Sequence, residues 1–310
     1  MVPPRRGAVR RHSPGLTLGA AAVNIRPPVP LGTHTAPRMT ALVVRRLLID
    51  LDQAIERHWC DGDAFLTAWF NALSMSFPVG EQFFIDAVRN GFKALPEAQQ
   101  SHFREEVQGF VGQEATHRRL HGLFNARIER HGLRNDWAPR ARQRLALLEG
   151  SDVRHSVAIT AANEHFTALF AEWLLAHPQV LGRSEPRLQT LWLWHSAEEA
   201  EHKCTAFDLY QALGGSHAWR VTWMRRVTLI FLSDVLRQTV SNLRADGTLW
   251  HWSTWRSAAR HLLGREGLLR TSYRPWKRYF REDFHPGQQH SDLSARWLAT
   301  NTGRYTRVGA

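Results

Sequence analysis

The chain contains only two cysteines, Cys60 and Cys204, among 310 residues. Two isolated cysteines do not form the disulfide framework of a small secreted domain, and neither has the spacing of a zinc-binding motif. No uninterrupted apolar run reaches the roughly 18 residues that a membrane-spanning helix needs. We therefore expect a cytoplasmic protein whose fold depends on one large hydrophobic core.

Acidic residues are absent from positions 1–38, which contain six arginines. Residues 215–310 carry 16 basic and six acidic side chains, so 18 basic and 22 acidic residues remain for 39–214. The net charge of +12 therefore belongs to the two ends of the chain. A basic chain can bind nucleic acid or an anionic membrane. No helix-turn-helix, zinc-finger or RNP-type signature is present, which argues against nucleic acid.

Residues 1–38 are rich in proline, glycine, alanine and arginine and show no periodic apolar face. This composition predicts a disordered basic extension. No apolar segment of the usual length follows the first arginines, so the segment does not read as a secretory signal. Met39 is an alternative start residue, in which case the extension is not part of the protein.

Proline, glycine and capping residues divide the next part of the chain into helices. We expect helical segments from Asp61 to Gly91 with a kink at Pro78, from Pro96 to Gly132, from Asp152 to His177, and from Pro186 to Leu213. A shorter helical stretch ends near residue 148. A further long helix is expected at 216–245.

Two of these segments carry a glutamate and a histidine three positions apart, Glu114 with His117 and Glu199 with His202. Side chains at i and i+3 of a helix share a face and can hold one ion together. Two other segments each carry a single glutamate: Glu81 follows the kink at Pro78, and Glu164 lies on the inward stripe of the segment that ends at His177. Along the chain the set is Glu81, Glu114, His117, Glu164, Glu199 and His202.

The order Glu, Glu-x-x-His, Glu, Glu-x-x-His is the ligand set of ferritin-like di-iron and di-manganese bundles. Charged side chains on a core stripe are costly unless they are paired or bound to metal. We therefore predict an all-α protein, with a ferritin-like four-helix bundle at 39–215 and extra C-terminal helices. Two metal ions are expected, with iron preferred and manganese or zinc as alternatives. The competing interpretation is that these charges lie on solvated helix faces.

Two further histidines are placed one helical turn from the predicted ligands. His195 precedes Glu199 by four positions, and His121 follows His117 by four. Both therefore face the metal side of their helices. We predict His195 as a catalytic residue, either a ligand or a proton shuttle. His121 is predicted as a ligand or an outer group.

Other polar residues near the motifs are weaker candidates. His165 follows Glu164 directly and points about 100° away from it, so a structural role is expected. Asp208 and Lys203 are candidates for outer partners of the ligands. Such groups more often pair at the surface.

The C-terminal part, 216–300, is basic and holds seven of the 13 tryptophans. Surfaces of tryptophan and arginine are typical of membrane interfaces or partner docking. We favour a helical extension that packs on the bundle, with peripheral membrane contact as the alternative. Residues 301–310 are expected to be a frayed tail. Nothing in the sequence indicates the oligomeric state.

Several motifs resemble the bacterial family of predicted metal-dependent hydrolases. They are F-P-V-G-E-Q-F-F at 77–84, G-Q-E-A-T-H-R-R-L-H at 112–121, E-H-F-T-A at 164–168, W-H-S-A-E-E-A-E-H-K at 194–203 and F-H-P at 284–286. The resemblance spans about residues 45–290. It implies a metal-dependent enzyme and leaves the substrate open.

Two chemistries are compatible with the predicted ligands. A di-iron centre could activate O2 to oxidise an organic molecule, which the carboxylate-rich ligand set favours. Alternatively, two metals could activate a water for hydrolysis, as the family label says. A non-enzymatic iron-binding bundle is a third class. Aromatic residues near the motifs favour an apolar or acyl-type small-molecule substrate, unless they are plain core: Phe77, Phe110, Phe166, Trp192 and Trp194.

Overall fold

Helices dominate the computed structural model, which describes residues 42–289 and 291–308, so the fold is all-α. The predicted extension at 1–38 lies outside these residues. None of the described helices is long and apolar enough to cross a membrane. The long helices are α1 (Ala64–Ala94), α2 (Glu97–Ile128), α4 (Val153–Ala176), α5 (Pro186–His202) and α7 (His217–Asp246). The short ones are α3 (Trp137–Ala146), α6 (Thr205–Ala212), α8 (Trp252–Ala258), α9 (Leu268–Arg278) and α10 (Leu293–Thr300).

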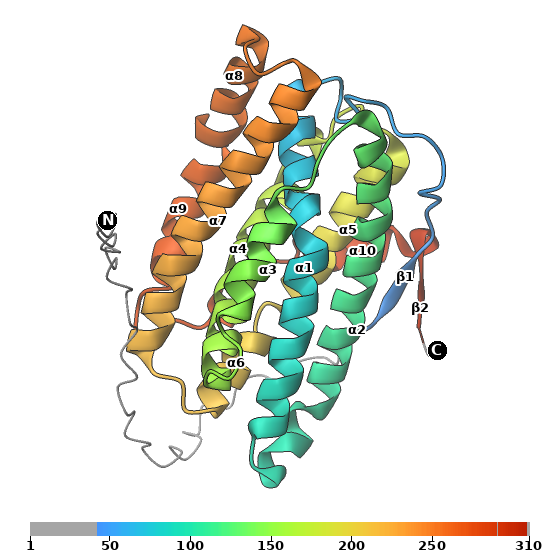
Figure 1. The fold of residues 1–310 in the computed structure, drawn as a ribbon. Helices are drawn as coiled ribbons and strands as arrows, with labels where there is room; N and C mark the ends of the chain where they lie inside the picture. The colour runs from blue at the N-terminus through green and yellow to red at the C-terminus, as the bar shows by residue number, and fades with distance from the viewer. Residues whose placement is uncertain (1–41, 290, 309–310) are drawn as a thin grey trace, which may run out of the picture.

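The long helices lie side by side and form the body of the molecule (Figure 1). Helix α1 packs against α2 and α4, and α4 packs against α5. Helix α7 covers both α1 and α4, while α9 packs on α4 and α10 on α5. Each of the four helices that carry the predicted ligands thus contacts at least two of the other three, and the C-terminal helices lie against them.

The start of α1 differs from the prediction by two residues. Asp63 is the cap, because its carboxylate accepts a hydrogen bond from the backbone N–H of Leu66. Asp61 instead has a φ of 53°, in the left-handed region, where it cannot begin a helix. Pro78 lies inside α1, and the helix continues through it to Ala94.

The predicted helix to Leu213 is interrupted after His202, and α6 begins at Thr205. Tertiary hydrogen bonds accompany the break. The ammonium group of Lys203 donates to the backbone carbonyl of Gln289, and the hydroxyl of Thr205 donates to Glu106 at 2.8 Å. Because these partners lie far away in the chain, no local pattern marks the interruption.

Two short strands join the ends of the described chain. Strand β1 (Arg45–Leu47) pairs antiparallel with β2 (Tyr305–Arg307), with Arg46 opposite Thr306. Figure 1 shows this ribbon beside α2. The expectation of a frayed tail from residue 301 is therefore wrong for 302–307, where a short helical turn leads into β2.

Asp234 of α7 connects this helix to α3. Its buried carboxylate accepts hydrogen bonds from Arg140, at 3.1 Å, and from Arg144. We expect Asp234→Ala to lower the free energy of unfolding by about 2–3 kcal/mol, because two guanidinium groups lose a desolvated partner. Urea unfolding followed by circular dichroism measures this change.

The matched control is Asp283→Ala, which removes an exposed carboxylate paired with Arg281 at 2.7 Å. An exposed pair is screened by water, so this variant should keep the wild-type unfolding midpoint. Equal effects of the two substitutions would show that the α3–α7 link is not important for stability.

Candidate metal centre

Helices α1, α2, α4 and α5 bring all six predicted ligands into one buried cluster. Each of the six side chains is at most 5% exposed. Within the described chain, one group of four has donor atoms that all lie within 4.8 Å of one another: Glu114, His117, Glu199 and His202. A second group with the same property comprises Glu81, His117 and His195. The separate segments of the sequence pattern therefore meet in space.

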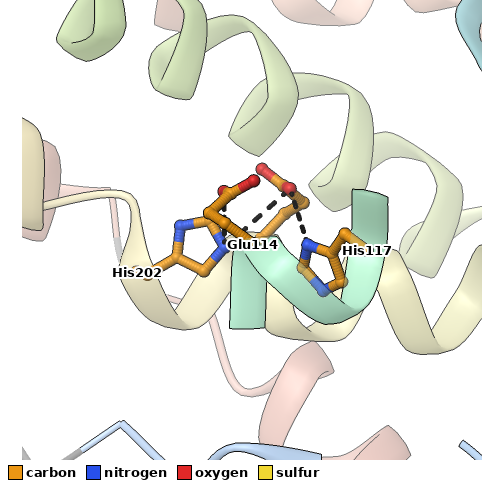
Figure 2. A group of neighbouring side chains, drawn as sticks. Glu114, His117 and His202 are labelled. Atoms are coloured by element: carbon orange, nitrogen blue, oxygen red, sulfur yellow. Dashed lines mark ion pairs between the residues drawn. The ribbon is translucent and has the colours of Figure 1, made fainter. Parts of the chain in front are cut away.

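Glu199 lies at the centre of the first group. Its Oε1 is 3.5 Å from Nδ1 of His117 and 3.8 Å from Nε2 of His202. Nε2 of His202 is also 3.4 Å from Oε1 of Glu114. Figure 2 shows His117 and His202 with a ring nitrogen turned toward the carboxylates between them. These separations are too long for ideal hydrogen bonds, so Nδ1 of His117, Nε2 of His202 and both oxygens of Glu114 remain available to an ion.

Glu164 contacts the opposite side of His202. Its Oε2 lies 2.8 Å from Nδ1 of His202, so it orients the ring while Nε2 points into the cluster. The other carboxylate oxygen, Oε1, is buried without a hydrogen-bond partner among the described residues. Glu164 can therefore support His202 through one oxygen and offer the other to an ion.

Eight buried oxygen and nitrogen atoms of the cluster, each able to bind a metal ion, have no hydrogen-bond partner within the described part of the chain. They are both oxygens of Glu81 and Glu114, one oxygen each of Glu164 and Glu199, Nδ1 of His117 and Nε2 of His202. Buried polar atoms in proteins are normally paired, and each unpaired one costs about 1–3 kcal/mol. Oxygen and imidazole nitrogen atoms converging in this way fit bound cations, which would satisfy the whole set.

The carboxylates of the cluster differ in their acidity. Burial raises the pKa of Glu81 and of Glu114 well above the usual range, and neighbouring carboxylates add to the rise. Burial also raises the pKa of Glu164 to about 7. Burial opposes ionisation of Glu199 as well, but the surrounding histidines hold its pKa well below the usual range. Without metal, the cluster therefore retains protons that cations must displace.

The histidines of the cluster also differ in their pKa values. Burial acts to lower the pKa of His117, but the hydrogen bond to Glu198 and the charge of Glu199 raise it to about 10. Burial and the nearby His117 lower the pKa of His195 to about 4. His195 is therefore neutral at physiological pH and has one ring nitrogen with a free lone pair.

A hydrogen-bond chain decides which nitrogen of His195 is free. The hydroxyl of Ser74 donates to Oδ1 of Asn125 at 2.7 Å, so it must accept from Nδ1 of His121 at 2.8 Å. The pKa of His121 is lowered well below its usual value by burial, which leaves its Nε2 as an acceptor for Nδ1–H of His195 at 2.7 Å. Nε2 of His195 then carries the lone pair, and it faces Oε1 of Glu199 at 2.8 Å.

The ring of His117 is supported by residues that no sequence motif marks. Nε2 of His117 donates to Oε2 of Glu198 at 3.0 Å, which leaves Nδ1 directed at the cluster. Glu198 in turn accepts from Arg45 of β1 at 3.0 Å, and Arg45 also binds Glu201 at 2.7 Å. Glu198 lies within the E-E-A-E run beside Glu199, but Arg45 is 153 positions away from it, and no sequence signal connects them.

Two predicted outer partners lie elsewhere. Asp208 pairs with Nε2 of His285 at 2.6 Å, so it anchors the F-H-P loop. Lys203 bonds to the carbonyl of Gln289, as described above. Of the two alternatives given for Asp208 and Lys203, pairing away from the ligands is therefore the one that these bonds show. His165 packs against the Tyr279 ring, with ring centroids 4.9 Å apart, in keeping with the expected structural role.

An apolar cavity of about 360 Å³ ends at His195 and Glu199. Its walls come from α1, α4, α5, α7 and α9. Three of the predicted aromatic residues line it: Phe77, Phe166 and Trp192. The other two pack on ligand rings instead. Trp194 lies 5.0 Å from His117 and Phe110 lies 5.0 Å from His202, measured between ring centroids.

A helical protein with a buried carboxylate–histidine cluster and an adjoining cavity belongs to the class of metal-binding helical proteins. A family model described as predicted metal-dependent hydrolase matches residues 43–290, and the chain belongs to this family. The match agrees with the resemblance found in the motifs. None of the curated proteins and none of the solved structures matches the chain.

Metal binding should release protons from this cluster. Because the pKa values of Glu81, Glu114 and His117 are raised, these groups carry more protons at low pH, and cations compete with those protons. We expect Mn(II) affinity to increase from about pH 6 to about pH 8, with proton release on binding. Calorimetry in buffers of different ionisation enthalpy measures both.

Glu105→Gln is the control, because Glu105 is an exposed carboxylate of α2 outside the cluster. It should leave the pH profile of Mn(II) binding unchanged. A constant affinity across this pH range in the wild-type protein would contradict the assignment of the cluster as a metal site.

Glu198→Gln should weaken metal binding by about 10–100-fold, because a neutral amide orients and polarises His117 less well than a carboxylate. Equilibrium competition with a chelator gives the affinity. Glu105→Gln, an exposed change on α2, is the matched control. Equal affinities of the two variants would exclude a role for Glu198 in the site.

Proposed function

We propose that this chain is a ferritin-like di-metal enzyme, with two iron ions, that uses O2 to oxidise an apolar small molecule. The observation that carries the proposal is the set of eight unpaired, buried donor atoms supplied by four helices. A structural bundle could bury hydrophobic residues at these positions and gain stability. A cluster of unpaired acids and imidazoles is instead what a pair of cations requires.

The donor groups divide between two ions. Glu114, His117, Glu199 and His202 form the compact group and would hold the first. The second would be held by Glu81 and His195, with the free oxygen of Glu164. Glu199 adjoins both groups, through His117 and His195, and would contribute to holding either ion.

His195 is included as a ligand because of its tautomer. The chain from Ser74 and His121 places the lone pair on Nε2, facing Oε1 of Glu199 at 2.8 Å and Oε1 of Glu81 at 3.9 Å. A lone pair opposite the ionised carboxylate of Glu199 is repulsive, whereas a bound cation would turn the contact into coordination. The site would then have three imidazoles and four carboxylates, one imidazole more than the sequence motif predicts.

Two bound irons would supply electrons to O2, with further electrons coming from an external reductant, and would thereby oxidise a substrate held beside them. The residues of this chain prepare that reaction. Glu198 and Arg45 fix the ring of His117, and Glu164 fixes that of His202. The apolar cavity excludes water and delivers the substrate to His195 and Glu199.

Hydrolysis is the second candidate, and the family description favours it. Two metals can activate a water and polarise an ester or amide carbonyl. The ligands here are rich in carboxylate, which suits iron or manganese. The cavity beside them is lined by apolar side chains and offers few groups to bind a polar leaving group. For these reasons we place oxidation first.

The test begins with protein loaded anaerobically with Fe(II). We expect about two irons per chain, O2 consumption on mixing with air-saturated buffer, and a new visible absorption band from oxidised iron. His202→Ala should lose iron binding and O2 consumption while keeping its helical circular dichroism. Glu105→Ala, on the exposed face of α2, should behave as the wild type.

The two chemistries give opposite outcomes. Iron-loaded protein that consumes no O2, together with Mn- or Zn-dependent cleavage of an ester, would replace oxidation by hydrolysis. Unchanged metal content in His202→Ala would overturn both.

A further inference from the structure

The apolar cavity connects the buried metal cluster with the surface. Its inner end is formed by His195 and Glu199, which are at most 5% exposed. Its outer end is formed by Leu232 of α7 and by Leu269 and Tyr273 of α9, which are 40%, 41% and 56% exposed. A ligand can therefore enter between α7 and α9 and reach the cluster with its leading end.

The walls between these ends provide almost no hydrogen bonds. The hydroxyl of Thr167 donates to the backbone carbonyl of Glu164 at 3.0 Å, and that of Thr228 donates to the carbonyl of Met224 at 2.7 Å. Most of the remaining wall is aromatic or aliphatic, including Leu73, Phe170 and Phe231. A polar group held midway would lose its hydrogen bonds to water, at a cost of about 1–3 kcal/mol. The cavity therefore selects a ligand whose inner portion is a hydrocarbon.

The volume sets the length of that hydrocarbon. A water takes up about 30 Å³ in the liquid, and a methylene group is of similar size, so about 360 Å³ accommodates roughly a dozen carbons. This lies near the lower end of the range for small-molecule sites.

The helix that contributes to the outer end of the cavity is strongly basic. Helix α9, which supplies Leu269 and Tyr273, carries four basic residues and no acid. They are Arg270, Arg274, Lys277 and Arg278, and all four are exposed. A carboxylate or phosphate group held at the rim would be attracted by these charges. The same charged group could not be buried in the middle of the cavity, where it would have no hydrogen-bond partner.

We propose that the substrate is a single-chain amphiphile with an anionic head group and a hydrocarbon chain of about a dozen carbons. The head lies at the rim of α9, and the chain extends inward, so that its far end lies beside His195 and Glu199. The role of this amphiphile as a substrate rests on the proposed function. The binding itself depends only on the cavity and its rim.

Binding is therefore measured on the full-length protein without metal. Calorimetric titration with saturated fatty acids of eight to sixteen carbons, below their micellar concentrations, should show an affinity that rises about fourfold for each methylene. The rise should stop at roughly a dozen carbons, where the cavity is full. An affinity independent of chain length, or tighter binding of a rigid polycycle such as pyrene, would overturn the proposal.

Head groups are compared at fixed chain length. Dodecanoate and dodecyl phosphate should bind more tightly than dodecanol, and added salt should reduce this advantage. The double variant Arg270→Gln/Arg274→Gln should lower the affinity for both anions and leave the affinity for dodecanol unchanged. The tighter of the two anions identifies the head group. Equal binding of all three compounds would exclude the charged rim as a recognition element.

Ser272→Trp places a bulky ring in the cavity wall and should reduce dodecanoate affinity by about tenfold or more. Ser253→Trp makes the same change on the exposed face of α8, outside the cavity, and should bind as the wild type. Leu232→Trp, at the exposed rim, provides a second, uncharged obstruction if the first variant does not fold. Equal affinities of all these proteins would overturn the proposal.

The binding test and the test of the proposed function can fail separately. Chain-length-dependent binding without iron-dependent O2 consumption would retain the amphiphile site and reject the oxidase. O2 consumption without binding of any chain would retain the di-metal centre and reject this substrate class.

Discussion

The rest of the structure has to accommodate a group of acidic side chains and imidazoles that are buried together, away from water. Four carboxylates and three histidines meet between α1, α2, α4 and α5, and the pKa values of Glu81 and Glu114 are raised well above the usual range by burial. Such a cluster is unfavourable as a set of free charges. The helices that carry it must therefore be held together by other contacts, which two hydrophobic clusters and the covering helix α7 provide.

Four residues of the buried cluster could be predicted from the sequence because they belong to a local pattern. The i, i+3 spacing of Glu114 with His117, and of Glu199 with His202, is a property of one helix and needs no knowledge of its neighbours. The structure brings these residues together as the pattern requires. The all-α fold followed from the same helical periodicity.

Contacts between distant segments could not be predicted in this way. Arg45 reaches Glu198 across 153 positions, and nothing in the sequence of β1 marks that arginine as different from its neighbours. The break after His202 and the pairing of β2 with β1 likewise depend on partners that only the folded chain brings near. The tautomer of His195 could not be predicted either, because it is set by Ser74 through His121.

Strand pairing between β1 and β2 has a consequence for the order of maturation. Arg45, which steadies Glu198 behind His117, belongs to a strand whose only partner within the described chain is Tyr305–Arg307. During synthesis the four ligand-bearing helices emerge long before that partner does. Arg45 therefore gains the strand partner that holds it behind Glu198 only once residues 305–307 have been made, so the support of His117 is completed later than the helices that surround it.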